Sequence, residues 1–239
     1  MKQEKLEELK RLSEQSGHEL GSAGGSKKVE IMAHFLKKHP IDAKLILDIG
    51  GSNFTYKLLK VFFPKAKVIT LNLEPSHTYE CESVIIGDAE DENIYKKLKN
   101  IDLIFCSDTI EHLRNPDKLM ENIRTVLKKD SYVILTAPNL ASWKDRLFLL
   151  FGYTPSSYDV SLKFKIGNPF SIQSSAGHIS TFTFNGLIDY LEKFGFRVIY
   201  KNSYNLTEKI KPLWRIRRLL EYVLPMGAKE VSFFVAVPK

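Results

Sequence analysis

The sequence predicts an α/β fold built around a mostly parallel β-sheet, and three observations support this prediction. Short apolar runs alternate with helical patterns from residue 45 onward, which is typical of right-handed strand–helix–strand units. Polar residues follow several of these runs directly, as they do where parallel strands end at a ligand site. The chain has 239 residues, 44% of them hydrophobic and 26% charged. It therefore has the size and balance of one globular domain with a modest extension.

The first 42 residues are expected to form a helical cap. Leucines recur at helical spacing among charged residues over positions 1–20, which indicates a short amphipathic helix. The glycine-rich stretch 21–26 is interpreted as a flexible joint, although such a stretch could also cradle a phosphate. A second helix is predicted over 27–39. It should end before Pro40, because proline disfavours helical backbone in the residue that precedes it.

Seven apolar runs are predicted to be strands, each bounded by turn-forming or polar residues. They cover 45–50, 66–73, 84–86, 101–107, 132–136, 196–200 and 231–237. Helical patterns between them cover 54–63, 93–98, 117–127, 183–194 and 210–224. Cys106 lies inside the fourth run, where a buried reduced thiol is expected. With Cys81 as the only other cysteine, no disulfide framework is predicted.

Charge and hydropathy exclude several classes of protein. The net charge is +7 with a pI near 9.2. The lysines are scattered among acidic residues, however, so a nucleic-acid partner is disfavoured. The sequence contains no run of eighteen apolar residues, so no membrane span is predicted, and the charged N-terminus lacks the apolar core of a signal peptide. A cytoplasmic location is therefore expected.

The residues of greatest functional interest lie where the first four predicted strands end. They are Asp48, Gly50, Gly51, Ser52 and Asn53 at the first strand, Asn72 and Glu74 at the second, Asp88 and Ala89 at the third, and Ser107 and Asp108 at the fourth. Glycines let the backbone approach a ligand closely, and the helix that follows offers free N–H groups. The further glycines of a dinucleotide fingerprint are missing, which favours a smaller cofactor without a pyrophosphate.

After the second strand a polar side chain can hold ribose hydroxyls, and after the third a carboxylate can accept a hydrogen bond from an exocyclic amine. Each residue taken alone could equally be a turn former.

Five segments, in this order and spacing, resemble the class I S-adenosylmethionine-dependent methyltransferases, in particular type 11 and type 12 members from biosynthetic gene clusters. The segments are 47–51, 72–76, 87–90, 105–113 and 127–139. The resemblance implies a Rossmann-like sheet of seven strands, the last one antiparallel, with helices on both faces. It also implies S-adenosylmethionine as cofactor, with S-adenosylhomocysteine as product. The methyltransferase domain is expected to span 43–239.

The resemblance also assigns roles to the strand-end residues. Gly50 and Gly51 would pass beneath the amino-acid part of the cofactor, and Asp48 would organise their loop. Asp88 and Ala89 would face the adenine, and Ser107 would lie near the methionine part. The ribose-binding position falls on Asn72, with Glu74 as the nearest carboxylate, and either or both could contact the ribose. The loop lacks the family's later glycines, which predicts a tighter pocket floor.

Glu111, His112 and His178 are the candidate catalytic residues. Methyl transfer needs a base only where the acceptor must lose a proton. His18, His34, His39 and His77 fall on predicted surface helices or loops. Glu111 and His112 instead follow the fourth predicted strand, and His178 lies at the end of an aromatic-rich insertion. One alternative is that they only cap and pack, and a second is that a histidine is the base for an oxygen nucleophile.

A third alternative is a divalent-metal site made with Asp108. Its pattern is similar to the Glu-x-x-Glu-His element of small-RNA 2′-O-methyltransferases and ubiquinone-pathway O-methyltransferases, with Asp in the first position. Two carboxylates with imidazoles would suit Mg²⁺ or a transition ion. Mg²⁺ is the less favoured alternative.

Residues 140–181 and 205–228 are predicted to be insertions that cover the cofactor and select the acceptor. Aromatic residues in the first could grip an apolar or glycan acceptor, or form the core of a lid. The apolar stripe of the second is typical of a packed lid helix, with contact to a lipid-linked substrate as the alternative. The expected function is methyl transfer to a small-molecule acceptor, at oxygen rather than carbon or nitrogen. The alternatives are an RNA or protein methyltransferase, or a non-catalytic methyltransferase-like binding partner.

Overall fold

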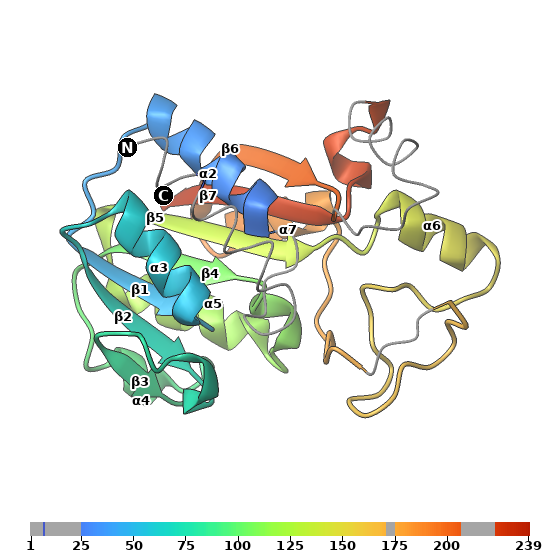
Figure 1. The fold of residues 1–239 in the computed structure, drawn as a ribbon, viewed down its shortest axis with the longest axis horizontal. Helices are drawn as coiled ribbons and strands as arrows, with labels where there is room; N and C mark the ends of the chain where they lie inside the picture. The colour runs from blue at the N-terminus through green and yellow to red at the C-terminus, as the bar shows by residue number, and fades with distance from the viewer. Residues whose placement is uncertain (1–6, 8–24, 171–174, 207–222) are drawn as a thin grey trace.

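A computed structural model describes residue 7 and residues 25–170, 175–206 and 223–239 (Figure 1). Its core is one seven-stranded sheet with the strand order β3-β2-β1-β4-β5-β7-β6. The strands are β1 (Leu45–Ile49), β2 (Lys67–Asn72), β3 (Val84–Ile86), β4 (Ile101–Ser107), β5 (Leu127–Pro138), β6 (Phe196–Tyr204) and β7 (Val231–Pro238). The first five are parallel, and β7 runs antiparallel between β5 and β6. The predicted mostly parallel sheet with a reversed last strand is confirmed.

Helices cover both faces of this sheet, as predicted. They are α2 (Gly25–Lys38), α3 (Asn53–Phe62), α4 (Glu92–Tyr95), α5 (Pro116–Val126), α6 (Trp143–Leu150) and α7 (Phe184–Lys193). Neighbouring strand residues point to opposite faces, so Ile46 packs with α2 and α3 whereas Leu47 packs with α5 and α7. The two faces thus build two separate apolar clusters.

Helix α2 begins at Gly25, two residues before the predicted start. Val29, Met32 and Phe35 are completely buried against the sheet.

The predicted helices over 1–20 and 210–224 fall largely or wholly outside the described residues, and the division of the chain at residues 42 and 43 stays a prediction.

Several elements differ from the sequence prediction. Strand β6 runs to Tyr204 instead of residue 200, and α4 ends at Tyr95 instead of residue 98. Strand β5 begins at Leu127 instead of residue 132, because Leu127 pairs with Ile101 before an irregularity in the ladder. Residues 128–130 are charged and exposed, so they interrupt the apolar pattern from which the start of the strand was predicted. Helix α6 lies inside the insertion, where Ser142 caps it by accepting a hydrogen bond from the Asp145 N–H. Its apolar residues run consecutively at its end, so no helical period was visible.

Within the ranges that the structure describes, no helix has both the length and the hydropathy needed to cross a bilayer.

Candidate functional site

The loop after β1 turns sharply over the end of β2. Gly50 adopts a φ of +68°, and the N–H groups of Gly50 and Gly51 both donate to the carbonyl of Leu71, at 2.8 and 3.3 Å. A Cβ at Gly50 would overlap Thr109, and one at Gly51 would overlap the carboxylate of Asp48. Both positions therefore require glycine, because the backbone passes too close to its neighbours for a side chain.

Asp48 supports this loop from within the sheet. Its side chain is fully buried, and Oδ2 accepts a hydrogen bond of 2.6 Å from the Thr55 hydroxyl. Ser52 and Thr55 form a capping box that starts α3. Burial raises the pKa of Asp48 to about 7, although the hydrogen bond from Thr55 and the charge of Lys28 act to lower it. Oδ1 is buried without a hydrogen-bond partner among the described residues.

The two ribose candidates at the end of β2, Asn72 and Glu74, differ in their contacts. Asn72 is held in the protein: Nδ2 donates to the Gly51 carbonyl at 2.6 Å, and Oδ1 accepts from the Glu74 N–H at 3.0 Å. The side chain of Glu74 is exposed and makes no hydrogen bond within the described ranges. Asn53, at the start of α3, is buried. Its Oδ1 accepts from the Glu80 N–H, while its Nδ2 has no partner there.

The end of β3 presents one exposed and one buried residue. Asp88 is exposed, and its Oδ1 accepts from the Glu90 N–H at 2.9 Å. Ala89 is buried, and its carbonyl accepts from the Tyr95 hydroxyl at 3.0 Å. Asp88 can therefore meet a ligand from solvent, whereas Ala89 offers it only a small apolar surface.

Lys28 joins the site at the end of β4, and the sequence interpretation missed it. Its side chain is buried on α2, and Nζ donates to Ser107 Oγ at 2.5 Å and to Asp108 Oδ2 at 2.6 Å. Asp108 adopts a φ of +52°, and its Oδ1 accepts from the hydroxyl of Thr136 at 2.8 Å. Helical spacing could have indicated this position, because Lys28 precedes the buried Met32 by one turn and so lies on the same face of the helix.

The candidate catalytic residues lie together. Ligand atoms of Glu111, His112 and His178 are within 4.8 Å of one another, and the two imidazole rings meet edge to face at 4.9 Å. The short 3₁₀ helix Ile110–His112, which directly follows β4, carries the first two residues. Both Glu111 carboxylate oxygens and His178 Nδ1 are buried without a partner among the described residues.

Desolvation controls the charges in this cluster, in which Glu111 is buried, His178 half-buried and His112 exposed at its surface. It raises the pKa of Glu111 well above its usual range, and the nearby charge of Asp108 raises it further. Desolvation lowers the pKa of His112. Burial and then the neighbouring His112 lower the pKa of His178 to about 4. Both imidazoles are therefore neutral at pH 7 and able to accept a proton.

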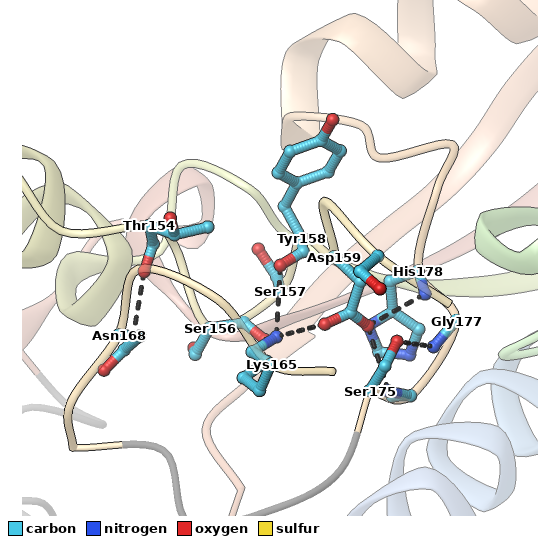
Figure 2. Close-up of polar contacts among 12 residues, drawn as sticks. Thr154, Ser156, Ser157, Tyr158, Asp159, Lys165, Asn168, Ser175, Gly177 and His178 are labelled. Carbon is cyan, nitrogen blue, oxygen red and sulfur yellow. Dashed lines mark hydrogen bonds and ion pairs between the residues drawn. The ribbon is translucent and has the colours of Figure 1, made fainter. Parts of the chain in front are cut away.

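The insertion brings His178 to this cluster. The Glu111 carbonyl accepts hydrogen bonds of 2.9 Å from the N–H groups of Ile179 and Ser180. Figure 2 shows the second anchor, in which the buried Asp159 carboxylate lies between Lys165 and the turn that carries His178. The distances from the carboxylate are 2.7 Å to Lys165 Nζ, 3.0 Å to the Ala176 N–H and 3.1 Å to the His178 N–H.

The predicted site residues thus fall into two groups. The glycine loop contacts the residues after β4, because Thr109 Oγ1 donates to the Ile49 carbonyl at 3.1 Å and lies against Gly50. Asp48, Asn72, Ser107 and Asp108 lie on or directly after β1, β2 and β4. Glu111 and His112 follow β4 in the 3₁₀ helix, and the insertion brings His178 to them. Glu74 and Asp88 are exposed beyond the ends of β2 and β3.

Comparison with known proteins identifies the family. A family model described as a methyltransferase domain matches residues 27–201. A search of curated proteins returned no match. Among solved structures, an S-adenosylmethionine-dependent methyltransferase from Archaeoglobus fulgidus is similar with a TM-score of 0.58 at 18% identity, covering 90% of this chain and 96% of that one.

Two further archaeal structures have the same fold. One comes from the complex between the Trm112 methyltransferase activator of Haloferax volcanii and a methyltransferase, with a TM-score of 0.61 at 12% identity over 98% of this chain and 97% of that one. The other is a protein from Pyrococcus horikoshii, with a TM-score of 0.59 at 16% identity over 94% of this chain and 95% of that one. With its sheet order and the domain match, the chain belongs to the class I S-adenosylmethionine-dependent methyltransferases.

Proposed function

We propose that this chain is an enzyme that transfers a methyl group from S-adenosylmethionine to an oxygen atom of a small-molecule acceptor. One observation carries the proposal: the buried carboxyl group of Glu111 lies together with the exposed His112 and the half-buried His178, close after Thr109, which contacts the glycine loop. S-adenosylmethionine supplies the electrophilic methyl group when bound. The chain then has to hold the cofactor, align the acceptor and take up one proton.

The residues around the glycine loop fit the amino-acid part of the cofactor. The glycines at positions 50 and 51 let the loop pass close to Thr109 and Asp48, where a side chain would overlap its neighbours. The buried oxygen of Asp48 without a partner can accept from the cofactor's ammonium group. Ser107 and Asp108, held by Lys28, line the neighbouring strand end.

Glu74 is the better ribose candidate, and Asp88 with Ala89 the adenine candidates. The Asn72 amide already makes hydrogen bonds to the Gly51 carbonyl and the Glu74 N–H. The Glu74 carboxylate is exposed and can accept from both ribose hydroxyls. Asp88 can accept from the exocyclic amine of adenine while Ala89 contacts the ring.

His112 is the proposed base, with His178 and Glu111 beside it. A base works best when its pKa lies near the working pH. The pKa of His178 falls to about 4, which makes it a weak proton acceptor. His112 is exposed at the edge of the cluster, where an acceptor can reach its imidazole. His178 and Glu111 then border the space in which the acceptor oxygen meets the base.

The same three side chains also offer the donors that a divalent ion prefers, two imidazoles and a carboxylate. Titrating the protein with Mg²⁺ and with Zn²⁺ in a calorimeter separates the alternatives. Base catalysis predicts transfer that survives a chelator, whereas a metal mechanism predicts loss of transfer and its return with the added ion.

Calorimetric titration with S-adenosylmethionine, S-adenosylhomocysteine and NADH tests the cofactor assignment. Micromolar binding of the adenosyl pair alone supports the proposal, and no binding of either contradicts it. Methyl transfer from labelled cofactor to phenol, catechol and sugar hydroxyls then tests the acceptor class. His112→Asn should keep cofactor affinity and lose transfer, while the exposed His77→Asn serves as the control.

The other functions make different predictions. Methylation of RNA would require binding that weakens steeply with salt. The Haloferax structure comes from a complex with an activator protein, so a partner role is the second candidate. A non-catalytic partner would bind no cofactor, which the same titration detects.

A further inference from the structure

Nine large apolar side chains are exposed on the insertion, and together they are called the insertion surface. They are Leu147, Leu149, Leu150, Phe151, Val160, Leu162, Phe164, Ile166 and Phe170. Their exposed fractions range from 46% for Leu147 to 75% for Leu150. An exposed apolar set of this size in one segment marks an interaction site.

The two parts of the insertion surface belong to one folded unit. Phe170 stacks on Phe148 of α6 with ring centroids 6.2 Å apart, and it meets Tyr153 edge to face at 5.5 Å. The Thr154 N–H donates to the Gly167 carbonyl at 2.8 Å. Figure 1 shows α6 and the loop after it extending beyond the end of the sheet. The surface therefore projects away from the body of the domain.

Acidic and basic residues of the insertion differ in exposure. Residues 143–170 contain four basic and two acidic residues. The acids, Asp145 and Asp159, are 1% and 2% exposed and accept hydrogen bonds within the insertion. Among the bases, Arg146 and Lys163 are exposed. The insertion thus presents apolar groups and positive charge outward while its negative charge is buried.

We infer that the insertion surface docks on the interface of an anionic lipid bilayer. Apolar side chains on a basic background bind such interfaces because the apolar groups enter the boundary between headgroups and acyl chains, and the bases attract anionic headgroups. The absence of exposed acids from residues 143–170 favours this partner over a neutral surface. Docking is independent of the proposed methyl transfer, although the same insertion carries the turn with His178.

Co-sedimentation with vesicles tests the inference, using the full chain without cofactor. One set of vesicles is phosphatidylcholine alone, and the other contains about one third phosphatidylglycerol. We expect binding to the anionic set, weakened at high salt, and little binding to the neutral set. Leu150→Ser/Phe151→Ser should abolish binding, whereas Tyr79→Ser/Ile86→Ser, which replaces exposed apolar residues elsewhere, should not.

Lys163→Gln is the milder variant, because it keeps the apolar residues and the fold. It should weaken partitioning by about fivefold, the contribution of one base near an anionic surface. Absence of vesicle binding by the folded protein overturns the inference. So does a dimer in light scattering that Leu150→Ser/Phe151→Ser dissociates, because a second copy would then cover the surface. Vesicle binding by a protein that fails to bind S-adenosylmethionine would keep the docking and reject the proposed function.

Discussion

Asp159→Asn should release the turn that carries His178. The wild-type carboxylate is fully buried, pairs with Lys165 and accepts the N–H groups of Ala176 and His178 (Figure 2). Asparagine has nearly the same shape but carries no charge, so it leaves a buried ammonium group without its counter-ion. The substitution therefore tests the charge and not the packing.

The expected cost follows from these contacts. Removing one partner of a buried ion pair costs about 3–5 kcal/mol. Lys165 keeps the carbonyls of Ser156 and Tyr158 as acceptors, at 2.8 and 3.1 Å, so the lower end of that range applies. A loss of about 3 kcal/mol corresponds to roughly a hundredfold easier opening of the turn.

Amide hydrogen exchange measures this opening residue by residue. The N–H groups of Ala176 and His178 should exchange about a hundredfold faster in Asp159→Asn, while amides of β1 and β4 should keep their protection. Asp130→Asn, a change of the same type at an exposed acid, should alter neither. Unchanged exchange at both amides in a folded Asp159→Asn protein would refute the reasoning, because the carboxylate would then not hold the turn.

Three further predictions concern the cofactor loop, the half-buried imidazole of His178 and the buried lysine. Gly51→Ala should weaken S-adenosylmethionine binding by about ten- to a hundredfold in calorimetry, because overpacking costs about 1–3 kcal/mol and the new Cβ overlaps Asp48. Gly227→Ala, whose Cβ meets nothing, should bind normally. The pKa of His178, about 4, lies below the ordinary 6.5, so its neutral form stabilises the fold fully above pH 6.5 and progressively less as the pH falls toward 4. The difference in unfolding free energy between wild type and His178→Asn should therefore shrink by on the order of 3 kcal/mol over that window, and a pH-independent difference would contradict the assignment. Lys28→Met should lower the unfolding free energy by about 2–3 kcal/mol in urea, less than a fully buried pair costs, since Asp108 is 22% exposed and can hydrate. Adding Asp108→Asn should recover part of the loss if the ion pair is its cause.

Local patterns made most of the fold predictable. Strands β1 to β4 are short apolar runs that end in glycine or polar residues, and each lies within two residues of its predicted limits. The reversed β7 could not follow from its own sequence, because pairing direction depends on what precedes the strand. The family resemblance supplied that feature.

The candidate site was only partly predictable. Residues at the ends of parallel strands meet at one edge by topology, so Asp48, Asn72 and Ser107 could be grouped without coordinates. The contact of His112 with His178 depends on hydrogen bonds from the end of the insertion to Glu111, which no spacing rule gives. Lys28 was missed because a lysine on a helix is usually solvated. Here it reaches Asp108 across 80 residues of chain.

The position of β7 has a consequence for the order of folding. This strand comes after β6 in the chain yet lies between β5 and β6, and it supplies hydrogen-bonded partners to both. Until β7 has left the ribosome, β5 has an open edge and β6 has no neighbour in the sheet. Such unpaired edges are prone to association with other chains. During synthesis, therefore, the edges of β5 and β6 that face each other stay unpaired until β7 inserts between them and pairs with both.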